Sequence, residues 1–378
     1  MLLRWIASAL LMLCSSMALA DADIPTPDEL DSIFAFRGVI YQQDDGADDK
    51  GGNPTIKEDA TIYEGIWLYQ HNINEQQAAR IKFTGDLVTA ASYDDARDKA
   101  ETLSGATGYN PGRFNFQLGW KYRTYDRFTV DVHASYGQEF AYRSTGYGVG
   151  FSQSLAEEST QISAQFQVYD DTVRMIRYNG AKEVDEPRKT YSGTLSLTQT
   201  LTPDSLFNLS WSNSEQSGML ATSFNSVLIN DDRYYEVTPD IRVRDTLSLR
   251  YKHAIGQNSI QTGISYYEDD WDIRAVVGEI RYFFNLDDGR LVLEPSYRYY
   301  HQDGSYFFAT FFEEPERYRS SDPDLGNFDG HSAGMTVSKW APGWFTNSLT
   351  RYDIGMNYYR RSDDLDFYWL TLGWYVPL

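Results

Sequence analysis

Apolar and polar residues alternate along most of the chain. In 113–123, "RFNFQLGWKYR", and in 128–136, "FTVDVHASY", the apolar and aromatic residues occupy every second position. Because successive side chains of a strand point to opposite faces, each segment predicts a β-strand with one apolar and one polar face. The pattern recurs near 33–44, 60–72, 77–92, 112–123, 126–140, 143–154, 159–172, 188–201, 203–217, 240–254, 257–269, 271–285, 289–303, 331–340, 344–360 and 364–377, which predicts about sixteen strands.

The connections between these segments alternate in length. Every second connection is short, as in "TYD", "TPD" and "IGQN". The long ones cover 45–59, 93–111, 173–187, 218–239 and 304–330, and they all fall at the opposite end of the strands. Short periplasmic turns and long extracellular loops are typical of antiparallel barrels in the bacterial outer membrane.

The polar faces of the strands decide between a sandwich and a barrel. They are rich in Ser, Thr, Asn, Gln, Arg and Glu, whereas the inner faces of a sandwich form an apolar core. The last segment, "DFYWLTLGWYVPL", also places six apolar or aromatic side chains on one face. In lipid a sheet must close on itself, because its edges find no water to bond. We therefore expect an all-β protein: one closed antiparallel transmembrane β-barrel whose final strand pairs with the first.

Composition supports this interpretation. The chain has 29 Tyr, 20 Phe and 9 Trp, yet its mean hydropathy is −0.51, as expected where apolar residues alternate with polar ones. The net charge of −21 argues against nucleic-acid binding, which needs a basic surface.

The first twenty residues have the layout of a secretory signal peptide. A basic residue, an apolar stretch and the small pair Ala18-x-Ala20 follow one another. We expect a signal peptide at 1–20, a periplasmic segment at 21–32 and the barrel at 33–378, located in the outer membrane. Cleavage after Ala20 would remove Cys14, the single cysteine, and with it any disulfide or thiolate chemistry.

Several stretches resemble an uncharacterised family of Gram-negative outer-membrane barrels, the domain of unknown function thirty-five seventy. They are 194–218, 234–256, "YYEDDWDIRA" (266–275), 295–308 and "RSSDPDLGNFDG" (319–330), in the order of the family. The resemblance implies an outer-membrane barrel and supplies no catalytic residues. It does draw attention to acidic and aromatic residues at the loop end: Asp269, Asp270, Trp271, Asp322, Asp324 and Asp329.

Parity along the strands assigns the charged and aromatic residues to opposite faces. The expected lumen-facing charges and polar groups are Lys121, Arg123, Asp131, His133, Arg250, Lys252, Arg274, Glu294 and Arg298. Such residues either pair across strands or set ion selectivity in a water-filled lumen. The aromatic residues expected in the girdles at the membrane boundary are Trp120, Tyr122, Trp211, Tyr251, Tyr297, Tyr299 and Trp374.

The sequence supports a structural role for its histidines better than a catalytic one. His133-Ala134-Ser135 has the His-x-Ser spacing of outer-membrane phospholipases, but parity turns His133 and Ser135 toward the lumen rather than the lipid. His301 and His331 flank the longest loop, without the spacing of metal ligands. We expect ordinary polar lumen positions and solvated rim residues in these places.

Two loop segments invite other interpretations. "DDGADDKGG" (44–52) lacks the register of a calcium loop, so a flexible outer loop that bridges to lipopolysaccharide through cations is expected. "DDARDKAETLSG" (94–105) has the composition of a short helix, which we expect to fold into the lumen.

The sequence thus predicts a non-enzymatic barrel without cofactor or metal. The leading hypothesis is a channel for small solutes, since sixteen strands leave room for water. The alternatives are a non-conducting scaffold that seats a periplasmic or surface partner, such as a redox protein or lipoprotein, and an enzyme at the rim. Expected partners are membrane lipid, lipopolysaccharide and the outer-membrane assembly machinery.

Overall fold

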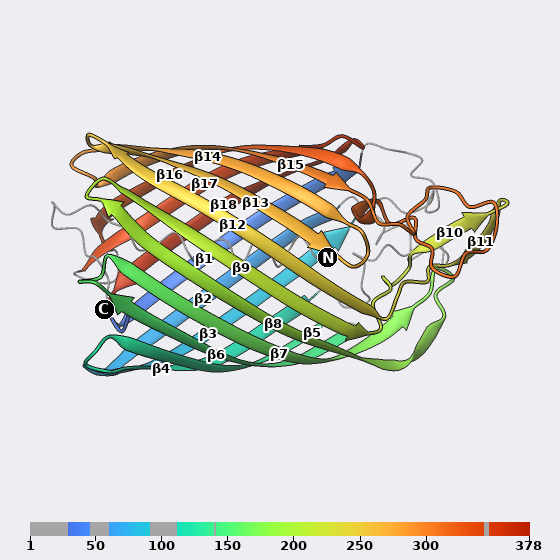
Figure 1. The fold of residues 1–378 in the computed structure, drawn as a ribbon, viewed down its shortest axis with the longest axis horizontal. Coiled ribbons are helices and arrows are strands. Elements are labelled where there is room, and N and C mark those ends of the chain that lie inside the picture. Colours follow the sequence, from blue (N-terminus) through green and yellow to red (C-terminus); the bar gives the residue numbers. More distant parts are fainter. Residues whose placement is uncertain (1–28, 46–59, 91–111, 140, 344–347) are drawn as a thin grey trace.

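The computed structural model describes residues 29–45, 60–90, 112–139, 141–343 and 348–378. Within these residues, sixteen strands form one closed antiparallel barrel, in the order β1-β18-β17-β16-β15-β14-β13-β12-β9-β8-β7-β6-β5-β4-β3-β2. Figure 1 shows the strands running obliquely around the barrel, with most of the irregular chain at one end. The prediction of a closed barrel of about sixteen strands is confirmed.

The strand bounds agree with the predicted segments to within a few residues in most cases. The barrel strands are β1 (Ile33–Asp45), β2 (Ala60–Asn74), β3 (Gln77–Ala90), β4 (Gly112–Arg123), β5 (Phe128–Glu139), β6 (Tyr142–Leu155), β7 (Thr160–Ile176), β8 (Lys182–Thr202), β9 (Ser205–Gly218), β12 (Ile241–Ile255), β13 (Asn258–Asp269), β14 (Arg274–Leu286), β15 (Leu291–Asp303), β16 (Phe328–Pro342), β17 (Leu349–Arg361) and β18 (Leu365–Pro377).

The barrel closes between its first and last strands. β1 pairs with β18 along its whole length, with Phe36 opposite Trp374. On the outer face, the ring of Phe36 lies 4.6 Å from that of Trp374 and 5.2 Å from that of Trp67 on β2, measured between centroids. Aromatic contacts therefore reinforce the seam that the terminal strand closes.

Apolar side chains cover the outside of the barrel. On the barrel strands the large exposed hydrophobic residues share one parity, except Val184 near the loop end of β8; examples are Leu118, Trp120, Ile264, Leu370 and Leu372. The opposite parity carries the polar and charged side chains. Apolar side chains thus face outward and polar ones inward, the reverse of a soluble protein. A sheet with such an outer face suits lipid, where unpaired edge strands would find no water to bond, so the sheet must close.

The two ends of the barrel differ. The end with the short turns, called here the turn end, also holds the last residues of β18; the other is the loop end. Two structured elements in the loops differ from the predicted irregular connections: the hairpin of β10 (Ser226–Ile229) with β11 (Asp232–Tyr235), and the 3-10 helix η1 (Pro323–Leu325). The predicted helix at 94–105 and most of the acidic stretch 44–52 lie outside the described residues.

The loop-end segments pack against one another. Trp271 and Phe307 meet at 5.0 Å between ring centroids in a cluster that also buries Ile273 and Leu325. A second cluster joins Val227 and Ile229 of β10 to Phe312. Figure 1 shows these segments extending beyond the barrel rim. No helix in the described part of the chain is long and apolar enough to span a membrane.

Candidate functional site: the barrel interior and the loop end

The inward face of the barrel carries two kinds of surface. The arc from β12 through β18 to β5 holds the charged residues, whereas β6–β9 present mostly uncharged polar groups along the spanning part. This neutral wall consists of Ser144, Gly146, Gly148, Gly150, Ser152, Gln161, Ser163, Gln165, Gln167, Ser192, Thr194, Ser196, Thr198, Asn208, Ser210, Ser212 and Ser214.

One group of ion pairs lies on β3–β5. Arg80 Nη2 is 3.1 Å from Asp131 Oδ1, and the same carboxylate oxygen is 3.4 Å from His133 Nδ1. The imidazole is nearly buried because it lies over Gly148 of β6, where a Cβ atom would collide with the ring. The predicted pairing of lumen charges across strands is present here, and it fixes the orientation of His133.

A second group lies on β14–β17. Arg281 bridges two carboxylates, with Nε 2.8 Å from Glu279 Oε1 and Nη1 3.1 Å from Glu294 Oε1. Arg351 Nε lies 2.8 Å from Asp353 Oδ1 on the same strand. Each carboxylate of this group therefore pairs with an arginine, and Glu279 and Glu294 share one.

These inward ion pairs keep contact with solvent. The side chains of Arg351, Arg281 and Glu294 retain 34%, 25% and 20% of their accessible surface. Water therefore reaches charged groups on the inner wall of the barrel. An apolar protein core would not leave this surface accessible.

A buried ion pair anchors the loop end. The carboxylate of Asp269 accepts hydrogen bonds from Arg242 (2.6 and 2.8 Å), from the hydroxyl of Tyr267 (2.7 Å) and from the backbone N–H groups of Trp271 and Ile273 (3.0 Å each). Five donors compensate a carboxylate with no exposed surface. The arrangement fixes the turn between β13 and β14 against β12.

A second carboxylate, Glu236, joins the two long loops. It accepts hydrogen bonds from the hydroxyl of Ser320 and from Thr222 N (2.8 Å), and the amide of Asn225 bridges it to Asp322. Burial, together with the nearby Asp322 carboxylate, raises the pKa of Glu236 to about 7. The loops 219–240 and 304–327 are therefore held by a carboxyl that binds its proton more tightly than a free glutamate does.

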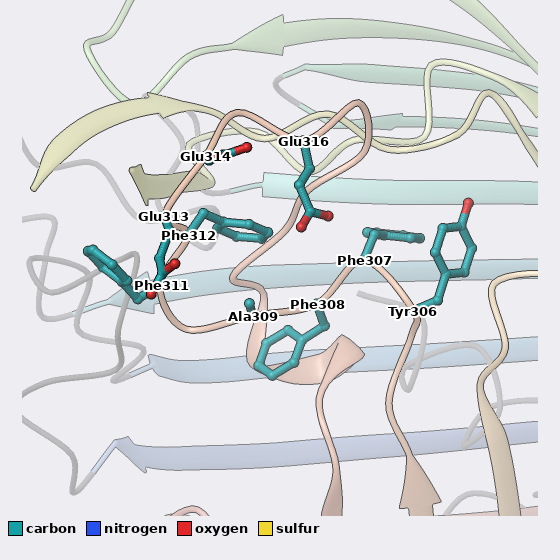
Figure 2. A pocket seen from close by; sticks show the side chains of 9 residues that line it. All are labelled: Tyr306, Phe307, Phe308, Ala309, Phe311, Phe312, Glu313, Glu314 and Glu316. Carbon is teal, nitrogen blue, oxygen red and sulfur yellow. The ribbon is translucent and has the colours of Figure 1, made fainter. Parts of the chain in front are cut away.

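A hollow of about 390 Å³ lies along the loop 304–327. Figure 2 shows the aromatic rings of Phe308 and Phe312 and the carboxylate of Glu316 among the side chains that line it. All of its lining residues belong to the single segment 306–316.

The predicted lumen residues occupy the inward face with one exception. Lys121, Arg123, Asp131, His133, Arg250, Lys252, Glu294 and Arg298 have inward parity. Arg274 does not: it shares the parity of the exposed Val276 and Ile280 and is itself exposed, so its assignment to the lumen is wrong. The doublet Val276-Val277 obscures the alternation at this point of the sequence.

The predicted loop-end residues have different environments. Asp270 accepts a hydrogen bond from the backbone N–H of Val243 on β12, and Asp322 accepts one from the Asn225 amide. Asp324 Oδ1 lies 2.5 Å from Arg361 Nη1. Trp271 and Asp269 are buried instead of exposed at the rim.

The two histidines beside the longest loop lie on the outer face. His301 Nδ1 is 2.9 Å from Asp329 Oδ1, and His331 Nδ1 is 2.8 Å from the hydroxyl of Tyr297. Within the described residues, no group of three or more metal-binding side chains occurs.

The aromatic residues predicted for the membrane boundary point outward from the barrel. Trp120 stacks on Tyr122 with ring centroids 5.8 Å apart. The others on this face are Trp211, Tyr251, Tyr297, Tyr299 and Trp374. Their role as girdles remains a prediction.

Sequence reasoning missed Glu236, Arg242 and Arg361. Arg242 has the inward parity of β12, so strand alternation could have identified it. Glu236 lies in a predicted loop without periodicity, and no sequence signal marks its burial.

Known protein families include one that matches almost the whole chain. A family model described as "Protein of unknown function (DUF3570)" matches residues 6–368. The chain belongs to this family. No curated protein sequence matches it.

Solved structures similar to this DUF3570 chain are outer-membrane proteins. A structure titled "Bacterial polysaccharide outer membrane secretin" has a TM-score of 0.50 and 8% identity, over 93% of this chain and 100% of that chain. The outer membrane protein opdK from Pseudomonas aeruginosa has a TM-score of 0.44 and 9% identity, over 92% and 98%. A BenF-like porin from Pseudomonas fluorescens Pf-5 has a TM-score of 0.47 and 9% identity, over 92% and 98%. The likeness shows that the DUF3570 chain has the fold of a closed β-barrel.

Proposed function

We propose that this barrel is a passive channel for small hydrophilic solutes. The observation that supports it best is the accessibility of the inward charged side chains, such as Arg351 at 34%. A closed sixteen-stranded barrel is wide enough to hold water unless a segment fills it. Water that reaches the inner wall provides a path along which solutes can move.

The lumen needs no reactive group for this role. The hydroxyl and amide groups of β6–β9 can replace part of the hydration shell of a passing solute. The charged arc on the other strands provides an electrostatic field across the path. Solutes would enter at the loop end, outside the cell, and leave at the turn end in the periplasm.

Conductance of the refolded protein in a planar bilayer tests this proposal. We expect stable current steps, and a folded barrel that inserts but carries no current would contradict it. Ser248→Trp places an indole on the inward face and should reduce the step size. Leu249→Trp, whose side chain faces the outside at the adjacent position, is the matched control and should leave the steps unchanged.

A scaffold barrel is the second candidate, favoured by the loop end. Tyr306 and Phe311 are 54% and 45% exposed beside the acidic Glu313, Glu314 and Glu316, a surface suited to a basic protein partner. A photo-crosslinking amino acid at position 311 in living cells should then give one discrete adduct. The same group at position 184, where Val184 is exposed away from this hollow, should give none.

A further inference from the structure

The charges of the lumen are not balanced. Glu139 and Glu186 share an inward register row at the loop end, and Asp269 pairs with Arg242. Seven further carboxylates face inward on the barrel strands, and six of them have an arginine within 4.0 Å: Glu64, Asp86, Asp131, Glu279, Glu294 and Asp353. The seventh, Asp171, is buried beside Tyr142 and Ser144. Arg113 and Arg281 each bridge two carboxylates, so four arginines face these seven carboxylates and three negative charges remain.

Five inward cations have no such compensation. Among the described residues, no carboxylate lies within ion-pair distance of Arg37, Lys82, Lys121, Arg250 or Arg298. All five retain partial exposure, so their charges act on the water of the lumen. On the inward faces of the described strands, positive charges outnumber negative ones, although the whole chain carries −21.

These cations stand on opposite walls. In the closed ring, β12 lies eight strands from β2, the neighbour of both β1 and β3. Arg250 lies five residues before Ile255, the turn-end residue of β12, and Lys82 lies five residues after Gln77, the turn-end residue of β3. The two cations therefore face each other at a similar height, and a solute must pass between them.

Each wall adds a further cation near this level. Arg37 on β1 lies two strands from Lys82, across Ile66 and Leu68 of β2. Arg298 shares one register row with Arg250, with Gly263 and Glu279 between them. Four unpaired cations thus surround the path, and Glu279 in this row pairs with Arg281, which it shares with Glu294.

We propose that this lumen selects anions, so that its substrates are small anionic solutes. The inference rests on the proposed channel function and adds a substrate class to it. Cations lining a water-filled pore raise the local concentration of anions and lower that of cations. The excess negative charge of the chain lies elsewhere, including the loop-end Glu313, Glu314 and Glu316.

The reversal potential under a KCl gradient tests the selectivity. On a low-salt side of about 0.1 M, where the Debye length is about 10 Å, chloride should permeate several times better than potassium. The preference should weaken as the ionic strength rises toward about 1 M, because the Debye length falls to about 3 Å. Acetate and phosphate gradients should give the same sign.

Charge-neutralising variants locate the cause. The double variant Lys82→Gln with Arg250→Gln should bring the chloride-to-potassium permeability ratio close to one, and Arg37→Gln with Arg298→Gln should lower it independently. Arg274→Gln removes an equal charge per substitution from the outer face and should leave the ratio unchanged. Heat-modifiable migration in electrophoresis verifies that each variant is a folded barrel.

The outcomes separate the two claims. A conducting barrel that prefers potassium, or a double variant that keeps the full chloride preference, overturns anion selectivity and leaves the channel intact. A folded barrel without any current overturns the channel itself and the selectivity with it.

Discussion

Protonation of Glu236 should control how firmly the two long loops hold together. Its carboxyl faces Thr222, Asn225, Ser320 and the carboxylate of Asp322, whose pKa is also raised by burial. The enclosed group has a pKa of about 7, against 4.5 for the free side chain. Because the enclosed carboxyl binds its proton more tightly, closure is most stable below about pH 4.5 and loses stability as the pH rises through about 7.

The magnitude follows from the two pKa values. Between pH 5.5 and pH 8, linkage gives a loss of about 2 kcal/mol in the free energy of loop closure. This corresponds to an increase of about thirtyfold in the population of the open loops. Hydrogen exchange of the backbone amides in 219–240 and 304–327, corrected for the intrinsic effect of pH, measures that population. Equal or greater protection at pH 8 would refute the reasoning.

A variant isolates the carboxyl as the cause. Glu236→Gln removes the titration and should flatten the pH dependence, leaving the smaller contribution of Asp322. The glutamine amide has a single acceptor oxygen and cannot accept from both the Thr222 N–H and the Ser320 hydroxyl, so overall protection should fall by about 1 kcal/mol at low pH. Glu316→Gln, beside the open hollow, should leave the slope unchanged.

Two further predictions concern packing. Asp269→Asn should lower the free energy of unfolding by about 3 to 5 kcal/mol in lipid vesicles, because it leaves the Arg242 charge buried without its partner. The control Asp303→Asn, at an exposed side chain, should change the free energy of unfolding by less than about 0.5 kcal/mol. Gly148→Ala should destabilise the barrel by about 1 to 3 kcal/mol through collision with the imidazole above it, whereas Gly150→Ala, whose nearest neighbour would be at 3.7 Å, should be tolerated. A wild-type-like denaturation midpoint for Asp269→Asn or Gly148→Ala would contradict the corresponding contact.

The fold was largely predictable because lipid imposes a simple rule on the sequence. Outward side chains must be apolar and inward ones can be polar, so alternation shows both the strands and their faces. Leu370, Leu372 and Trp374 obey this rule on β18, and the pairing of β18 with β1 follows from the need to close the sheet. Arg274 was misplaced because consecutive valines interrupt the alternation beside it.

The chemistry of the site was less predictable. Arg80 and Asp131 are 51 residues apart in sequence, and their contact depends on the register of three strands. Burial of Glu236 depends on loops that pack without periodic signals. Alternation therefore gave the direction of the lumen charges but could not tell which of them are paired.

A channel requires that the inward face borders water that connects the two ends of the barrel. Cys14 is the single cysteine of the sequence and falls in the predicted signal peptide, so an introduced thiol can be labelled selectively. A small, anionic, membrane-impermeant thiol reagent should react with Ser248→Cys in an open channel and reduce the current stepwise, while Leu249→Cys on the outer face should show no change in current. Failure of the reagent to react at position 248, or an equal effect at both positions, would contradict the account.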